Sequence, residues 1–186
     1  QATDYVKDQT QPQLQYYTLD MNTKTLTLSF DETLDPGSID FSAISLQSTD
    51  VARFGFKRDL TGSEAEFGIE EFSTDVTITL ATDVVADMKR NQVGSKASMS
   101  LLAYTDTFIA DYAGNYAPPQ WDSGIEGYVP LTPSIFTADS TEPSLQSWFL
   151  DRKTGEFYVT FDEPVYIQDG SLFEIFASAT GQGLSQ

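Results

Sequence analysis

The chain of 186 residues contains no cysteine and no histidine. These absences exclude thiol nucleophiles, Ser-His and Cys-His dyads, most zinc sites and the usual general base near neutral pH. Catalysis would then depend on carboxylates, tyrosines and lysines alone, and we do not expect an enzyme. The lack of disulfides leaves the cellular compartment open, because many large exported repeat proteins contain none.

Positive charge and long apolar runs are also scarce. Ten Lys and Arg face 28 Asp and Glu, so the formal net charge is −18. A surface of this charge repels nucleic-acid phosphates and anionic membranes and attracts cations, so we expect neither as a partner of this segment. The longest apolar runs, such as 100–104, fall far short of the roughly 20 residues that cross a bilayer. A content of 40% apolar residues nevertheless suffices for a sizeable core.

An internal repeat organises the sequence. Residues 8–15 match residues 139–146, an offset of 139 − 8 = 131. The match continues without a gap, so that 27–32 aligns with 158–163. A fixed spacing of this kind indicates a tandem array of similar units.

Short β-forming runs alternate with turn-rich segments along the chain. Seven strands are expected, at Leu14–Thr18, Thr25–Phe30, Ile39–Gln47, Arg53–Lys57, Val76–Leu80, Ala97–Phe108 and Ser134–Ala138. Between the fifth and sixth, a short helix would be capped by Thr82 or Asp83 and end near Gly94. Its apolar face would hold Val84, Val85 and Met88. Seven short strands in one period favour a β-sandwich.

Several short motifs follow one another along the chain in a definite order. They are Asp-x-Thr-x-Pro-x-Leu from Asp8, Leu-Asp-Met-Asn-Thr at 19–23, Leu-Thr-Leu-Ser-Phe-Asp-Glu at 26–32, Val-Thr-Ile-Thr-Leu at 76–80 and Asp-Tyr-Ala-Gly-Asn at 111–115. This order resembles the bacterial-type Ig-like (cadherin-like) tandem repeats of large extracellular surface proteins. It is most similar to the version found in exported surface proteins of diatoms and related flagellated algae. The resemblance covers 8 to about 120 and 139–165.

The resemblance implies an all-β protein built from Ig-like Greek-key β-sandwiches in tandem. Residues 1–138 would then form one complete repeat, and 139–186 the N-terminal part of a second, truncated repeat. An insertion near 118–130 departs from the usual pattern.

Acidic residues are expected to converge at one pole of this sandwich. The turn after the second strand and the turn between the sixth and seventh lie where the first strand begins. Calcium takes six to eight oxygen ligands from carboxylates, amides and carbonyls. We therefore predict a calcium site from Asp8, Asp31, Glu32, Asp111 and Asn115, repeated in the second copy by Asp139, Asp162 and Glu163. A cation there would stiffen the joint between repeats, as in cadherin-like arrays.

The same acidic residues have a simpler interpretation. Asp-x-Ala-Gly-Asn is also a good turn sequence, because Gly and Asn tolerate a left-handed backbone and Asp binds local amides. The Phe-Asp-Glu motif can equally be a strand that ends in solvated charges. The chain contains no strict calcium-loop spacing of the Asp-x-Asp-x-Asp-Gly kind.

An aromatic group near the insertion suggests a second kind of site. Tyr116, Trp121 and Tyr128, together with Pro118 and Pro119, could form a platform for a sugar or a neighbouring subunit. The alternative is that they pack over the insertion itself.

These features predict a structural or adhesive module of a secreted cell-surface or filament protein, such as a flagellar-hair-like appendage. Its partners would be neighbouring repeats or identical subunits, and surface glycans. The alternative prediction is a carbohydrate-binding module of an extracellular protein.

Overall fold

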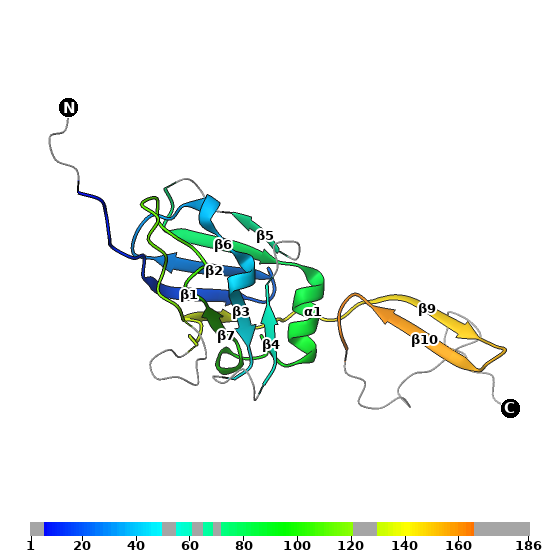
Figure 1. The fold of residues 1–186 in the computed structure, drawn as a ribbon. Helices are drawn as coiled ribbons and strands as arrows, with labels where there is room; N and C mark the ends of the chain where they lie inside the picture. Colours follow the sequence, from blue (N-terminus) through cyan, green and yellow to red (C-terminus); the bar gives the residue numbers. More distant parts are fainter. Residues whose placement is uncertain (1–5, 50–54, 61–64, 69–71, 121–129, 166–186) are drawn as a thin grey trace. The chain divides into compact units, whose positions relative to one another are not determined.

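The computed structural model describes residues 6–49, 55–60, 65–68, 72–120 and 130–165 (Figure 1). The chain divides into two compact units, Gln1–Glu142 and Pro143–Gln186. The division falls shortly after Asp139, where the second copy of the sequence begins.

The first sheet of unit 1 is built around a hairpin. Strands β1 (Leu14–Asp20) and β2 (Thr25–Phe30) pair antiparallel, and the order of the sheet is β5-β6-β2-β1-β8. Strand β6 (Asp75–Leu80) pairs antiparallel with β2, and β5 (Ala65–Gly68) pairs with β6. Strand β8 (Ile135–Thr137) is parallel to β1.

The second sheet of unit 1 has three strands in the order β4-β3-β7. The central strand β3 (Ile44–Gln47) pairs antiparallel with both β4 (Lys57–Asp59) and β7 (Leu101–Tyr104). The described residues of unit 1 are thus predominantly β, with two open sheets and one short α-helix, an arrangement consistent with a β-sandwich.

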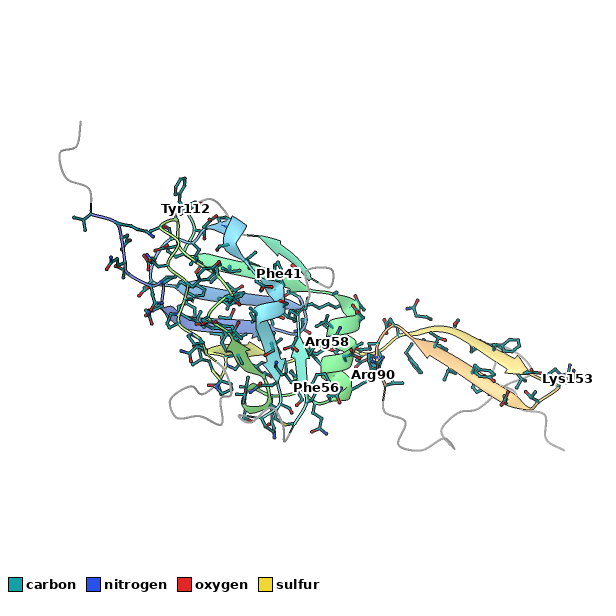
Figure 2. All side chains as sticks on the ribbon, viewed as in Figure 1. Phe41, Phe56, Arg58, Arg90, Tyr112 and Lys153 are labelled. Carbon is teal, nitrogen blue, oxygen red and sulfur yellow. The ribbon has the colours of Figure 1, made fainter. Side chains whose placement is uncertain are left out.

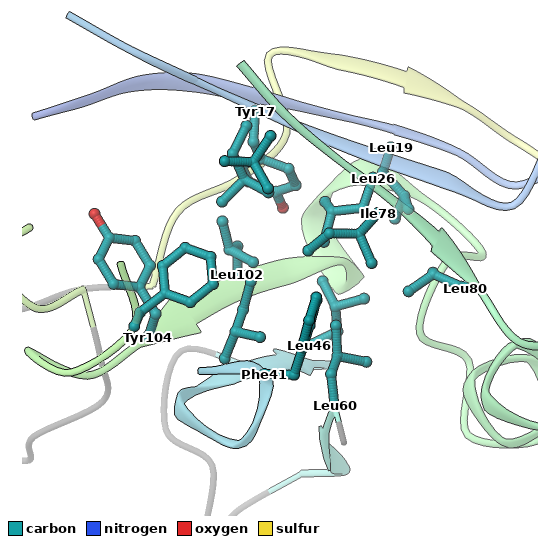
Figure 3. Packing of buried hydrophobic residues seen from close by; sticks show 14 of the residues in the cluster. Tyr17, Leu19, Leu26, Phe41, Leu46, Leu60, Ile78, Leu80, Leu102 and Tyr104 are labelled. Carbon is teal, nitrogen blue, oxygen red and sulfur yellow. The ribbon is translucent and has the colours of Figure 1, made fainter. Parts of the chain in front are cut away.

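The two sheets bury one shared core. Alternate residues of a strand point to the same face, so each strand contributes every second side chain. Figure 3 shows residues of the first sheet above those of the second: Tyr17, Leu19, Leu26, Ile78 and Leu80 face Leu46, Leu60, Leu102 and Tyr104. Burying each such side chain stabilises the fold by about 1.5–3 kcal/mol.

Tyr17 adds a polar connection across this core. Its ring is fully buried, and its hydroxyl donates to the carbonyl oxygen of Ser100, the residue before β7. The same hydroxyl lies 3.1 Å from the carbonyl oxygen of Leu131. Burial raises the pKa of the phenol, so Tyr17 stays neutral and remains a donor.

The helix α1 (Thr82–Arg90) joins β6 to the segment before β7. Its buried residues are Val84, Val85 and Met88, which confirms the predicted apolar face. The predicted cap is wrong: the N-cap is Ala81, and Thr82 is already the first helical residue.

No helix among the described residues is long and apolar enough to cross a membrane.

Local hydrogen bonds shorten two of the expected strands. The carboxylates of Asp35 and Asp40 accept from the amides of Gly37 and Ser42, which winds the chain into 3-10 turns before β3 begins at Ile44. A 3-10 turn at Ala97–Met99 likewise precedes β7. Strand β5 was not predicted, and the expected strand at 53–57 lies partly outside the described residues.

The second unit contains the hairpin of β9 (Leu145–Asp151) and β10 (Glu156–Phe161). Its strands follow β1 and β2 at the offset of the sequence repeat, since Leu145 and Glu156 are the counterparts of Leu14 and Thr25. The pairing registers correspond as well. Leu14 pairs with Phe30 and Leu145 with Phe161, and each pair adjoins the same shift in register.

Equivalent capping hydrogen bonds are present in the two hairpins. The Asp31 carboxylate accepts from the Gln13 amide at 2.8 Å, and that of Asp162 accepts from Ser144 at 2.8 Å. At the turn, Lys24 and its counterpart Gly155 both have a positive φ. Glycine adopts this conformation without strain, so the second copy has the less strained turn.

Gly94, in the segment after α1, packs closely against the first hairpin. Its φ is +79°, and an added Cβ would lie 2.5 Å from Cε of the buried Met21. We expect Gly94→Ala to lower the free energy of unfolding by about 2–4 kcal/mol, from left-handed strain plus overpacking. Gly114→Ala is the matched control: its φ is +84°, but no atom lies within 4 Å of the added Cβ.

Urea denaturation of both variants in chelator would measure the difference. Gly114→Ala should lose only the backbone contribution of about 1–2 kcal/mol. Equal losses for the two variants would show that the contact with Met21 does not matter.

Candidate metal centre

Three carboxylates converge at the end of unit 1 where β1 begins. Asp8, Glu32 and Asp111 each offer one oxygen, and these oxygens all lie within 4.8 Å of one another. Asp8 is exposed, Glu32 is half-buried and Asp111 is only 4% exposed. Two oxygens bound to one calcium ion at about 2.4 Å lie at most about 4.8 Å apart, so the spacing is compatible with a shared calcium ion.

Backbone hydrogen bonds fix the loops that carry these residues. The Asp35 amide donates to the Ala110 carbonyl at 2.9 Å, and Leu34 forms an isolated bridge with Asp111. The Leu34 amide in turn donates to the Ser73 carbonyl at 3.0 Å. The chain after β2 is therefore held between the start of β6 and the Asp111 loop, and Glu32 is brought to Asp111.

Asn115 orients the Asp111 carboxylate. Its backbone amide donates to one carboxylate oxygen at 2.8 Å and its side-chain amide to the other at 2.8 Å. The same side chain reaches the Asp8 carbonyl oxygen at 3.3 Å and so connects the segment before β1 to the loop. Gly114 supplies the left-handed residue of this tight turn.

Glu32 is the least satisfied member of the cluster. Its Oε1 atom is buried and has no hydrogen-bond partner. Burial raises the pKa of Glu32, and the neighbouring charges of Asp111, Asp8 and Asp31 raise it further. A bound cation would reverse this repulsion and supply the missing partner.

Asp8 behaves differently from Glu32. Hydrogen bonds from the Thr10 amide and hydroxyl lower the pKa of Asp8, so its carboxylate stays ionised. The Asp8 oxygen that faces Thr10 lies 2.9 Å from the amide nitrogen. Asp8 therefore supplies one anionic ligand whether or not Glu32 is protonated.

Of the residues predicted for this first site, four come together and one is engaged elsewhere. Asp8, Glu32, Asp111 and Asn115 meet at this pole. The carboxylate of Asp31 caps the Gln13 amide instead. Its charge still acts on Glu32, but its hydrogen bond secures the start of β1.

Two of the three residues predicted for the second copy, Asp139 and Asp162, have partners within their own units. Asp139 forms an ion pair with Lys89 and accepts from the Thr141 amide at 2.9 Å. Burial alone would raise the pKa of Asp139, but these contacts outweigh it and the pKa lies below its ordinary value. In the second unit, Asp162 caps Ser144, and Glu163 follows it at the end of the hairpin.

The predicted sugar platform is described only in part. Tyr116 is exposed, whereas Trp121 and Tyr128 lie outside the described residues.

An aromatic pair that was not predicted from the sequence lies beside the acidic cluster. The rings of Phe72 and Tyr112 stack with centroids 5.4 Å apart, and Figure 2 shows Tyr112 at this end of unit 1.

Neutralising Glu32 should stabilise unit 1 when no divalent cation is present. The raised pKa means that the folded state holds the Glu32 proton more tightly than the unfolded state, so stability falls as pH rises through the folded pKa. Glu32→Gln should therefore raise the free energy of unfolding at pH 7 by up to about 1 kcal/mol. The gain should vanish below about pH 4, where the unfolded-state carboxyl is also protonated.

Denaturant titrations in chelator between pH 3 and 8 would measure this difference. Asp106→Asn is the control, because it removes an exposed acid whose side chain has no ion pair or hydrogen bond among the described residues. A gain from Asp106→Asn equal to that from Glu32→Gln would indicate a general effect of net charge.

Comparisons of the chain with protein-family models, with curated proteins and with solved structures find no match. The internal repeat, the arrangement of the sheets and the acidic cluster therefore carry the information on function.

Proposed function

We propose that this chain is a structural module of an extracellular surface or appendage protein, in which Ig-like β-sandwich units follow one another as stiff spacers. In this proposal a calcium ion held by Asp8, Glu32 and Asp111 joins the segment before β1 to the body of its unit. The chain acts through its shape and its contacts, without catalysis.

The observation that carries the proposal is the correspondence between the hairpins β1–β2 and β9–β10. Strand bounds, register, register shift and the capping aspartates all recur at the offset of the sequence repeat. A unit repeated in one chain is typical of fibrous and surface arrays, where length is obtained by adding copies.

The segment that leaves unit 1 is held firmly, as a stiff spacer requires. The Asn22 side chain accepts from the Ser140 amide at 2.8 Å and donates to the Ala138 carbonyl at 3.2 Å. The Met21 amide donates to the Thr137 carbonyl at 2.9 Å, and Lys89 holds Asp139. These contacts hold residues 137–140 against the body of unit 1.

Calcium should raise the melting temperature of the chain. At a free concentration about a hundred times the dissociation constant, binding stabilises the folded state by about 2.7 kcal/mol, or on the order of 5–10 °C. Asp111→Asn and Glu32→Gln should remove most of this gain, because each removes a carboxylate ligand. Scanning calorimetry in calcium and in chelator, at fixed ionic strength, would measure it.

Asp31→Asn is the matched control for this experiment. Asp31 caps the Gln13 amide, so its loss should lower the melting temperature about equally with and without calcium. Identical melting curves for the unsubstituted chain in calcium and in chelator would contradict the calcium part of the proposal.

A second candidate function, carbohydrate binding, is favoured by the stacked pair of Phe72 and Tyr112. Their side chains are 70% and 49% exposed. Phe72 also has a φ of +62°, a conformation that a bulky residue rarely adopts and that is more often found at functional sites. Exposed aromatic rings are the surfaces on which sugar rings commonly stack.

Retention on an array of neutral and acidic glycans would test this second candidate. Phe72→Ala and Tyr112→Ala should each weaken retention about tenfold or more, which corresponds to about 1.4 kcal/mol or more. Tyr16→Ala is the control, since Tyr16 is a similarly exposed aromatic of unit 1 whose ring stacks on no other ring among the described residues. A loss seen only with Trp121→Ala would place the sugar at the platform predicted from the sequence, and no retention at all would reject the candidate.

A further inference from the structure

Two exposed aromatic rings form a small apolar surface at the end of unit 1 where β1 begins. The rings of Phe72 and Tyr112 stack at an interplanar angle of 30°, and both residues remain exposed although they contact each other. Among the described residues, the Tyr112 hydroxyl has no hydrogen-bond partner. A ligand can therefore reach both rings and one free hydroxyl, on the outside of the unit where Figure 2 labels Tyr112.

The two rings are carried by the loops that also carry the acidic cluster of Asp8, Glu32 and Asp111. Tyr112 directly follows Asp111 in the sequence. On the other side, the residue after Phe72 accepts through its carbonyl from the Leu34 amide at 3.0 Å, and Leu34 forms the isolated bridge with Asp111. The aromatic surface and the carboxylates are therefore neighbours in the fold.

The acidic cluster has no countercharge in the part of the chain that the structure describes. Asp8, Glu32 and Asp111 form no ion pair there, and neither does the exposed Lys7, the basic residue nearest to them in sequence. The hydrogen bonds to the carboxylates of Asp8 and Asp111 come from neutral amide and hydroxyl groups. The negative charge of the cluster therefore attracts cations to this end of the unit.

The aromatic rings add a second attraction for cations. The face of a phenyl or phenol ring carries partial negative charge, and a protonated amine within about 6 Å of the ring centroid is attracted to it. The same faces offer apolar area to the C–H groups of a sugar ring. A sugar with a protonated amine satisfies both attractions and the charge of the acidic cluster at once.

We propose that the pair of Phe72 and Tyr112 binds a glycan that carries protonated amines, such as an oligosaccharide of glucosamine. The sugar rings stack on the two aromatic rings, and the amines lie toward the acidic cluster. Glycans that carry carboxylate or sulfate groups are repelled by the same charges. The inference rests on the second candidate function, carbohydrate binding, and names the class of sugar.

Calorimetric titration of the full chain with two matched tetrasaccharides would test the inference. Tetramers of glucosamine and of N-acetylglucosamine have the same sugar rings, but only the first is charged at about pH 6. We expect the charged tetramer to bind about tenfold more tightly at about 0.1 M salt. The preference should disappear near 1 M salt, where the Debye length falls to about 3 Å. Chelator in every titration keeps the result independent of calcium.

Two substitutions separate the contribution of the rings from that of the charge. Phe72→Ala should weaken both tetrasaccharides about tenfold or more, because it removes one of the two stacking surfaces. Asp8→Asn should weaken only the charged tetramer, by about two- to threefold, because it removes one negative charge and keeps the oxygen that accepts from the Thr10 amide.

Asp20→Asn is the matched control for the charge. Asp20 accepts from the amide two residues later, as Asp8 does. It lies at the other end of β1, a strand of seven residues that is about 20 Å long. At about 0.1 M salt, where the Debye length is about 10 Å, Asp20→Asn should leave the binding of both tetrasaccharides unchanged.

Three outcomes would overturn the inference. They are equal binding of the two tetrasaccharides, binding of the glucosamine tetramer that survives Phe72→Ala, and tighter binding of tetralysine than of the glucosamine tetramer, which would make a basic peptide the partner. Equal binding that Phe72→Ala abolishes would still support carbohydrate binding, whereas no binding of either tetrasaccharide would reject both. The failure of the inference is thus distinguishable from the failure of the candidate function.

Discussion

The burial of one face of the β1–β2 hairpin against β3 and β7 is the constraint on which the rest of unit 1 depends. The alternation of apolar and polar residues along both strands assigns Tyr17, Leu19, Leu26 and Leu28 to that face. The Tyr17 hydroxyl then connects the two sheets through the Ser100 carbonyl. Once these two layers are stacked, the ends of the strands determine where each loop lies.

The acidic pole is a consequence of this stacking. The chain before β1, the turn after β2 and the loop that carries Asp111 all reach the same end of unit 1, where backbone hydrogen bonds join them. Asp31 and Glu32 are neighbours in sequence but have different roles there. Asp31 caps the start of β1, whereas Glu32 joins Asp8 and Asp111 with a buried oxygen that has no partner.

The second hairpin shows which features of the first depend on local sequence and which depend on tertiary packing. It reproduces the register, the shift and the capping aspartates of the first, because these depend on residues near one another in sequence. It does not reproduce the burial of the apolar face, because that depends on strands far along the chain. The counterparts of the side chains that are buried in unit 1 are therefore half-buried or exposed in the described part of the second unit.

The sequence by itself determined the features that side-chain periodicity and turn residues encode: the predominance of β-structure, the strand at 25–30, the buried face of α1 and the constant offset between the hairpins. Strand ends were harder to predict, because aspartate carboxylates compete with the strand for backbone amides. The convergence of Asp8, Glu32 and Asp111 followed from the resemblance to Ig-like repeats, but the diversion of Asp31 to Gln13 did not. Only the tertiary structure decided such contacts, because the packing of whole sheets sets the distance between segments far apart in sequence.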